Sequence, residues 1–253
     1  MKIASWNVNS INVRLQQVLD WLTANTIDVL ALQETKVVDD MFPQAAFTEV
    51  GYQVVFSGQK SYNGVAIIAK APISAVTLAN PFFVDPEKRF LAASINGVRV
   101  VNVYVPNGQS VGSEKFMYKL DYLTGIKKYL LAELKNYAQT VVLGDFNIAP
   151  DDLDVHDKEL WQGSVLVSPL EREAFSAILN LGFTDALRYI EPKSKVYTWW
   201  DYRQGSFRRN NGLRIDHILL SKSLTANCKR VVVDKEPRKF ARPSDHAPLW
   251  VEF

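Results

Sequence analysis

The chain has 253 residues, of which 47% are hydrophobic and 22% charged, a balance that excludes a disordered protein and fits a globular one. Cys228 is the only cysteine, which excludes an intramolecular disulfide and a cysteine-built metal site and favours a reducing compartment. The net charge of +2 is unevenly spread, because residues 188–253 hold 14 Lys and Arg against 7 Asp and Glu, or +7, which leaves −5 for residues 1–187. This basic end would attract a polyanion, or it is merely a solvated face.

The N-terminal segment MKIASWNVNS has too few apolar residues for the core of a signal peptide, so we predict a cytoplasmic protein. No linker rich in Pro, Gly or Ser interrupts the chain. We therefore predict a single domain over residues 1–253.

The first two predicted strands both end in polar residues. A strand over residues 2–8 runs into Asn7, and a helix with an apolar stripe over residues 15–22 follows it. A second buried strand covers residues 27–32 and ends just before Glu34. An exposed pair with a lysine would stabilise the protein by only about 0 to 1 kcal/mol, which gives no reason for an acid at this place.

Short strands dominate the next part of the chain. They are predicted over residues 52–57, 64–69, 74–78, 89–95 and 98–105. Asn96 and Gly97 form the clearest hairpin turn, so successive strands pair antiparallel and the sheet is mixed rather than purely parallel. The last of these strands ends at Tyr104, followed by Asn107.

The third part of the chain contains the longest predicted helix, over residues 113–137, which leads into a buried strand over residues 140–143. This strand stops at Gly144 and is followed by Asp145 and Asn147. Taken alone, Asp145 would more often be a helix cap than a catalytic group. Further on, Ser168, Pro169 and Glu171 form a capping box at the start of a helix that Gly182 ends.

The C-terminal part predicts a strand over residues 196–200, an exposed basic loop over 201–212 and a strand over 213–220. Asp216 lies in the middle of this last strand, where a buried carboxylate needs a partner. Asp245 and His246 precede the closing strand.

Polar side chains thus gather at the ends or centres of six strands. They are Asn7, Glu34, Tyr104, Asp145 with Asn147, Asp216, and Asp245 with His246. No serine-elbow motif, Gly-rich phosphate loop or cysteine nucleophile accompanies them. The set favours oxygen ligation of a hard divalent cation, with an Asp216–His246 pair beside it, and hydrolysis of a phosphoester.

The ordered motifs WNVNS, QETK, YVPNG, LGDFN, LRIDHILLS and SDHAP resemble the endonuclease/exonuclease/phosphatase superfamily. The segments TWWDYR, NGLRIDH and RPSDHAP resemble, within it, the exonuclease III family of abasic-site endonucleases. The resemblance implies a four-layer α/β sandwich of the deoxyribonuclease I type, with two mixed β-sheets packed face to face and flanked by helices. It further implies a monomeric, Mg²⁺- or Mn²⁺-dependent nuclease. Its substrate would be double-stranded DNA with abasic sites or blocked 3′ ends, and no membrane would be involved.

The resemblance also implies roles for individual residues. The metal ligands would be Glu34, Asn7 and Asp245. The catalytic group would comprise Asp145, Asn147, His246, Asp216 and Tyr104. The substrate-binding residues would be Trp199, Leu213, Asn107, Arg203, Arg208, Lys60, Tyr62 and Asn63.

Four aromatic or imidazole side chains are interpreted either as part of the site or as structural residues. Because side chains alternate, we expect Trp199 to face the site and Trp200 to be a core residue. His156 is interpreted as a surface histidine, or else as a bulky group that narrows the abasic pocket and favours trimming of 3′ ends. His217 is interpreted as a packed structural histidine.

Two other functions are kept open. One is a superfamily phosphoesterase that acts mainly on 3′ ends or on a small phosphoester. The other is a DNA-binding module without catalysis, although none of the motif positions has lost a chemical group.

Overall fold

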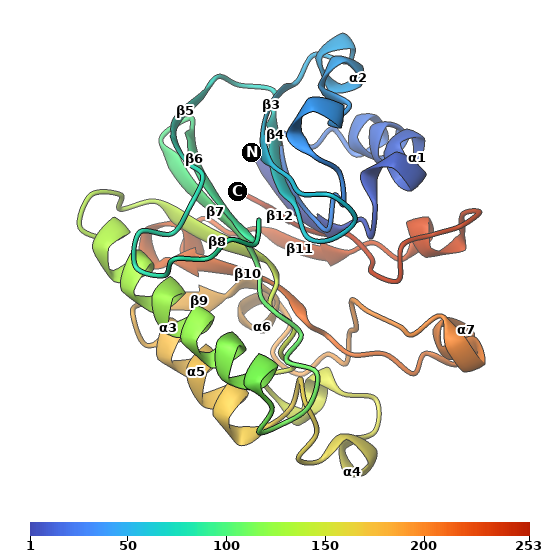
Figure 1. Ribbon diagram of the computed structural model, residues 1–253. Coiled ribbons are helices and arrows are strands. Elements are labelled where there is room, and N and C mark those ends of the chain that lie inside the picture. Colours follow the sequence, from blue (N-terminus) through green and yellow to red (C-terminus); the bar gives the residue numbers. More distant parts are fainter.

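Two six-stranded β-sheets lie face to face in the computed structural model, which describes all residues 1–253 (Figure 1). The first sheet has the strand order β11-β12-β1-β2-β4-β3, and the second has the order β5-β6-β7-β8-β10-β9. The strands are β1 Lys2–Asn7, β2 Val29–Gln33, β3 Gln53–Ser57, β4 Val65–Ala69, β5 Ile73–Thr77, β6 Phe90–Ile95, β7 Val98–Tyr104, β8 Thr140–Asp145, β9 Phe183–Asp185, β10 Asp216–Ser221, β11 Arg230–Val233 and β12 Leu249–Glu252. The α-helices are α1 Ile11–Ala24, α2 Gln44–Glu49, α3 Glu114–Glu133, α4 Lys158–Trp161, α5 Pro169–Leu179, α6 Ala186–Ile190, α7 Ser206–Arg209 and α8 Lys222–Thr225.

Both sheets are mixed. Strand β1 is parallel to β2, and β7 is parallel to β8, whereas the remaining pairs are antiparallel. The turn between β6 and β7 is the predicted two-residue hairpin, in which Asn96 and Gly97 both have positive φ, as a type I′ turn requires.

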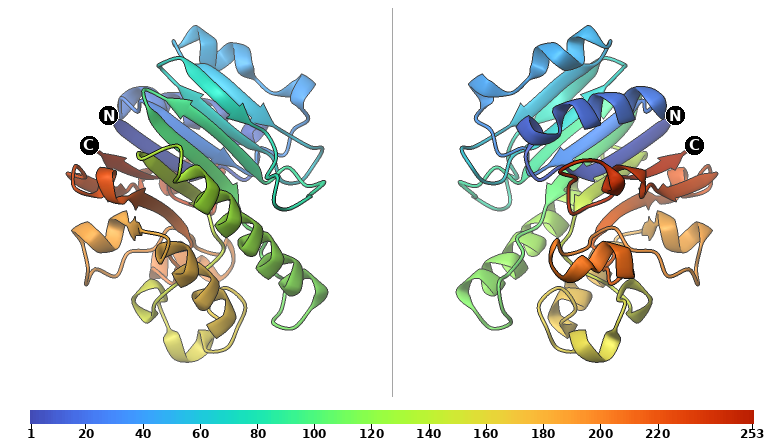
Figure 2. Two further views of the ribbon diagram at one scale, coloured as in Figure 1. Left: turned by 90° about the vertical axis from the view of Figure 1, so that its left-hand side faces the viewer. Right: turned by 90° about the vertical axis from the view of Figure 1, so that its right-hand side faces the viewer.

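Alternation of side chains along the strands builds the layers. Ile3 and Val29 point into the space between the sheets, where 22 buried residues form the largest apolar cluster. Ala4 and Leu30, their neighbours in sequence, face the opposite side, which α1 and α2 cover. The second sheet is covered in the same way by α3 and α5 (Figure 2). The predicted four-layer α/β sandwich is confirmed.

The polar strand ends meet at one edge of the sandwich. Asn7 ends β1 and Asp145 ends β8, and Glu34 directly follows β2. Strand β10 runs antiparallel to β8 and pairs Asp216 with Asp145, so the start of β10 lies where β8 ends. For the same reason His246, shortly before β12, reaches this edge, because β12 is antiparallel to β1.

Gly144 is required by close packing within the second sheet. Its φ is 139°, and a Cβ atom there would lie 1.9 Å from the carbonyl oxygen of Val103 on β7. Any side chain would push β8 away from β7 and displace Asp145.

Two predicted strands differ from the structure. Residues 196–200 form no strand, because Trp199 only makes isolated bridges, to Leu213 on one side and to His246 on the other. Strand β10 begins at Asp216 rather than at Leu213, so Asp216 lies at the start of the strand and not in its middle. The physical reason is that the backbone N–H of Arg214 donates to the carbonyl of Asp154 and that of Ile215 donates to the hydroxyl of Thr198, rather than to a neighbouring strand.

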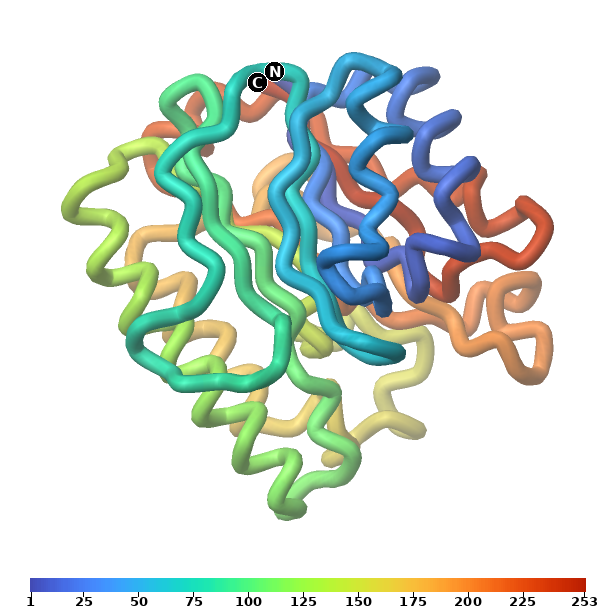
Figure 3. The backbone as a smooth tube through the Cα atoms, turned by 45° about the horizontal axis from the view of Figure 1, so that its top comes forward, coloured from blue at the N-terminus to red at the C-terminus, as the bar shows by residue number.

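The two chain ends lie side by side (Figure 3). The Met1 amino group donates to the carbonyl oxygen of Phe253 at 3.1 Å. None of the helices has the length and apolar character needed to cross a membrane.

Candidate active site

A cavity of about 370 Å³ opens at the edge where the polar strand ends meet. It is lined by Glu34, Tyr104, Asn107, Asp145, Asn147, Trp161, Val165, Leu166, Trp199, Asp201, Arg203, Ile215, Asp245 and His246. Nine of these residues were predicted as site residues from the sequence. The cavity therefore brings most of the predicted acid, amide and imidazole set together.

Asp145 lies at the floor of the cavity and is buried. Its carboxylate accepts hydrogen bonds from Nδ2 of Asn7 (2.9 Å) and from the backbone N–H of Asn147 (2.9 Å). Burial raises the pKa of Asp145 to about 7, with a further rise from the negative charges of Asp216 and Glu34 that the charge of His246 opposes. A carboxyl group of this kind takes up and releases a proton near neutral pH.

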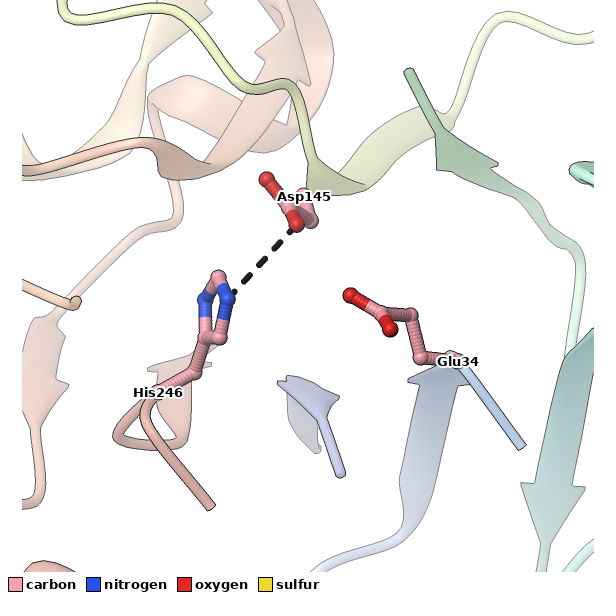
Figure 4. Close-up of side chains that lie close together, drawn as sticks. All are labelled: Glu34, Asp145 and His246. Carbon is pink, nitrogen blue, oxygen red and sulfur yellow. Dashed lines mark ion pairs between the residues drawn. The ribbon is translucent and has the colours of Figure 1, made fainter. Parts of the chain in front are cut away.

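His246 is held between two carboxylates. Its Nδ1 lies 2.8 Å from Oδ2 of Asp216, and its Nε2 lies 3.7 Å from Oδ2 of Asp145 (Figure 4). Burial opposes a charged ring, but the charges of Asp216 and Asp145 outweigh it and raise the pKa of His246 to about 10. The ring is therefore an imidazolium at neutral pH and serves as a donor rather than as a metal ligand.

Glu34 completes a compact cluster with Asp145 and His246. One side-chain atom from each of the three residues lies within 4.8 Å of the others, and Figure 4 shows the three groups facing a common space. Carboxylate oxygens are the donors that hard divalent cations prefer. Since His246 is charged, Glu34 and Asp145 are the two groups that fit a divalent cation here.

The other two predicted metal ligands, Asn7 and Asp245, are both held by hydrogen bonds beside this cluster. Asn7 directs Nδ2 to Glu34 (2.8 Å), while its Oδ1 accepts from the backbone N–H of Asn9 (3.0 Å), so no amide oxygen faces the cluster. Asp245 lies outside the cluster, with one oxygen bonded to Asn9 and the other to Nε1 of Trp199, both at 2.9 Å. Asn9 was not predicted as a site residue, yet it bonds to both of these side chains, with its backbone N–H to Asn7 and with its amide to Asp245.

Tyr104, Asn107 and Asn147 line another wall of the cavity. Burial raises the pKa of Tyr104 well above 10, helped by the charges of Glu34 and Asp145, so its hydroxyl stays protonated. Asn147 adopts a positive φ of 50° and donates from Nδ2 to the carbonyl of Val105 (3.0 Å). The Asn107 amide donates to Oδ1 of Asn147 (3.4 Å).

The apolar wall differs in part from the prediction. Trp199 lines the cavity, and Trp200 is fully buried in the core, as predicted. Leu213 does not reach the cavity, because it is fully buried among apolar residues behind Trp199. Ile215, two residues further along and in the same apolar cluster as Leu213, lines the cavity instead.

Trp161, on the short helix α4, also lines the cavity and was missed. The available signal was an apolar aromatic residue in an otherwise acidic loop. His156 does not line the cavity; its Nδ1 lies 3.2 Å from the carbonyl of Gly212. His217 is fully buried, and burial lowers its pKa to about 4, as fits a neutral structural histidine.

The other predicted substrate-binding residues spread over the neighbouring surface. Arg203 lines the cavity and pairs with Asp201 (2.6 Å). Tyr62 and Asn63 line an adjoining cavity of about 720 Å³ that shares Asn107 with the first. Lys60 and Arg208 are exposed and line neither cavity.

Comparison with known proteins identifies the family. The model of the Endonuclease/Exonuclease/phosphatase family matches residues 4–246. The chain belongs to this family. The exodeoxyribonuclease III of Haemophilus influenzae is 34% identical over the full length of both chains, which confirms the predicted branch.

Two solved structures of this branch superpose closely on the chain. The 3′ phosphatase NExo from Neisseria, bound to a product DNA hairpin, has a TM-score of 0.99 and 47% identity, covering 100% of this chain and 99% of its own. An AP endonuclease from Archaeoglobus fulgidus has a TM-score of 0.97 and 41% identity, with the same coverage. Divalent-metal dependence in this family agrees with the acidic cluster of Glu34 and Asp145.

Proposed function

We propose that this chain is a DNA repair nuclease that hydrolyses the phosphodiester 5′ to an abasic site, and that it also removes 3′ phosphates and 3′ nucleotides. The observation that carries the proposal is the cluster of Glu34, Asp145 and a charged His246 in one cavity. The relatives named above, which act on abasic sites and on 3′ ends, support the substrate class.

The residues divide the work of hydrolysis. A divalent cation, Mg²⁺ or Mn²⁺, held by Glu34 and Asp145 would supply positive charge to the phosphate oxygens. Asp145 orients the attacking water or takes its proton, because its carboxylate lies at the floor of the cavity beside Glu34 and His246. As the water oxygen bonds to phosphorus, the bond from phosphorus to the 3′ oxygen breaks and leaves a 3′ hydroxyl.

Donors around the cavity stabilise the charge that develops on the phosphate. The imidazolium of His246, the protonated hydroxyl of Tyr104 and the amide of Asn147 surround the same space. Preorganised donors in a partly buried site are effective because they need no reorganisation during the reaction.

Substrate binding uses the apolar wall and the basic loop. Trp199 and Ile215 offer an apolar surface to a sugar that lacks its base, and extruding such a residue costs less than extruding a paired one. The segment around α7, which projects from the body in Figure 1, carries Arg208 and Arg209 for contacts with phosphates. In this proposal residues 1–253 act as one monomeric domain in the cytoplasm, in keeping with the free thiol of Cys228.

A second candidate function is preferential processing of 3′ ends. It is favoured by Trp161, whose ring occupies part of the cavity wall beside Val165 and Leu166. It is also favoured by the 47% identity to a 3′ phosphatase. A smaller pocket would admit a terminal phosphate more readily than an extruded sugar.

Matched duplexes distinguish the two functions. Initial rates are measured on one sequence that carries an internal abasic site, a 3′ phosphate or a recessed 3′ hydroxyl, with Mg²⁺ and with EDTA. The first proposal predicts metal-dependent cleavage at the abasic site at a rate similar to removal of the 3′ phosphate. Phosphate removal alone would favour the second function, and no reaction, or reaction in EDTA, would contradict both.

A further inference from the structure

A fully buried ion pair lies directly behind the proposed active site. Lys119, on α3, and Glu171, in the first turn of α5, pair with no exposure of either side chain. Lysines are rarely buried completely unless they are paired, and burial lowers the pKa of Lys119 while the charge of Glu171 opposes the shift. Neither residue reaches the cavity.

The three ammonium protons of Lys119 each have an acceptor. Besides Glu171, Nζ donates to the backbone carbonyl of Asn147 at 2.6 Å and to that of Asn107 at 3.1 Å. These two asparagines belong to different strand ends, after β8 and after β7, and their side chains bond to each other. A single ammonium group therefore fixes the two amides of the site relative to each other.

Glu171 also holds the backbone at Leu166, a residue that lines the same cavity. Oε1 accepts from the backbone N–H of Leu166 (3.0 Å), and Oε2 accepts from the backbone N–H of Ser168 (3.0 Å). Leu166 lines the cavity and has a φ of 77°, which a leucine rarely adopts. Asn147, held from Lys119, also has a positive φ. The pair thus maintains two unfavourable backbone conformations that shape the site.

We propose that the Lys119–Glu171 ion pair is a positioning element for the reaction, which acts through Asn147 and Asn107 on the bound phosphate. It rests on the proposed function. Besides Glu171, the acceptors of Lys119 are the carbonyls of two residues that line the cavity, Asn107 and Asn147, so the position of the ammonium group is coupled to the geometry of the site. An apolar pair of the same volume would fill this place at least as well.

The variant that tests the proposal is the double substitution K119M/E171Q. It leaves no unpaired buried charge, and the glutamine can still accept from Leu166 or Ser168, so the fold is expected to persist. The carbonyls of Asn147 and Asn107 lose their common donor. A misplacement of about 1 Å costs about 100-fold in rate, so we expect kcat to fall about 100-fold with KM little changed.

A matched control lies on the same helix. Glu133 pairs with Arg99 near the C-terminal end of α3, about 21 Å of helix away from Lys119. The variant E133Q also breaks a largely buried ion pair, but it should leave kcat unchanged. K119M/E171Q combined with N107A/N147A should be no slower than N107A/N147A alone, because the ion pair acts through these two amides.

The outcomes separate this inference from the proposed function. If the wild-type protein cleaves DNA and K119M/E171Q retains its kcat, loses activity additively with N107A/N147A or fails to fold, the positioning role is wrong. If the wild-type protein cleaves none of the duplexes, the proposed function is wrong. The inference is then decided by NMR: the side-chain amide resonances of Asn107 and Asn147 should shift in K119M/E171Q and stay in place in E133Q.

Discussion

His246 owes its charge to the carboxylates around it. Its Nδ1 lies 2.8 Å from Asp216, and Asp145 lies on the other side of the ring. Oδ1 of Asp216 is buried without a hydrogen-bond partner. The hydrogen bond between Oδ2 and His246 is therefore the one that this carboxylate makes. The carboxylate thus both orients the ring and keeps it protonated.

We therefore predict that Asp216→Asn lowers the pKa of His246 from about 10. The imidazole resonances of the metal-free protein, followed by NMR from pH 5 to 11, report the change. Mutation of a distant acid such as Glu114, exposed at the start of α3, should leave the titration unaltered. An unchanged His246 titration in Asp216→Asn would contradict this assignment.

The same shift predicts how stability depends on pH. A histidine whose pKa is raised in the folded state stabilises the fold below about 6.5, and this contribution is lost as pH rises through about 10. The decline is at most about 1.4 kcal/mol for each pH unit. His246→Gln should make the free energy of unfolding, measured with urea in EDTA, depend less on pH over this interval.

The two residues should also act as one unit in catalysis. Asp216→Ala removes the partner that keeps His246 charged, so its loss of rate overlaps with that of His246→Ala. Each single substitution is expected to cost about 100-fold or more in kcat, and the double substitution about as much as the larger single one. Multiplicative losses would show that Asp216 acts independently of His246.

At the scale of elements, the loop that carries α7 governs binding rather than chemistry. Arg208 and Arg209 are exposed outside the cavity. For duplex DNA we predict that each Arg→Ala substitution weakens affinity for abasic and intact duplexes alike. Each should reduce the slope of log K against log salt by about 0.9, one phosphate contact. Lys127→Ala, on the exposed face of α3, is the control; equal slopes in all three variants would exclude the loop as the phosphate-binding surface.

The sequence allowed the strand ends to be predicted because buried strands stop abruptly at polar residues. Asp145 after the apolar run of β8 and Glu34 after β2 both lie at the predicted edge. The hairpin at Asn96 and the capping box at Ser168 could be predicted because local turn chemistry decides them.

Contacts between distant segments decided what the sequence did not reveal. Asp245 is bonded by Asn9, from the N-terminal part of the chain, and by Trp199 from another segment. Leu213 packs against Val155 and Leu166, which belong to a loop far from it in the sequence. The alternation of side chains along one strand gives no information about such contacts between distant segments.

At the scale of the whole molecule, the cluster exists only when the two sheets pack together. Glu34 follows β2 in the first sheet, whereas Asp145 ends β8 in the second. The unfolded chain offers no such arrangement, so a divalent cation should bind the folded state preferentially. At a concentration 100 times its Kd the cation would stabilise the fold by about 2.7 kcal/mol.

Thermal unfolding with and without Mn²⁺ or Mg²⁺ checks this expectation. The melting temperature should rise with the cation in the wild-type protein and in Glu114→Gln, but not in Glu34→Gln. A rise that persists in Glu34→Gln would place the cation elsewhere.

Strand-resolved cleavage under single-turnover conditions shows whether this edge of the sandwich cuts DNA at an abasic site. The substrate is a labelled duplex with one abasic site, with an intact duplex as control, and the proteins are wild type and Asp145→Asn. We expect a single cut 5′ to the abasic site that leaves a 3′ hydroxyl. It requires a divalent cation and is slowed at least about 100-fold by Asp145→Asn. Cleavage of both duplexes alike, or an undiminished rate in Asp145→Asn, would contradict this expectation.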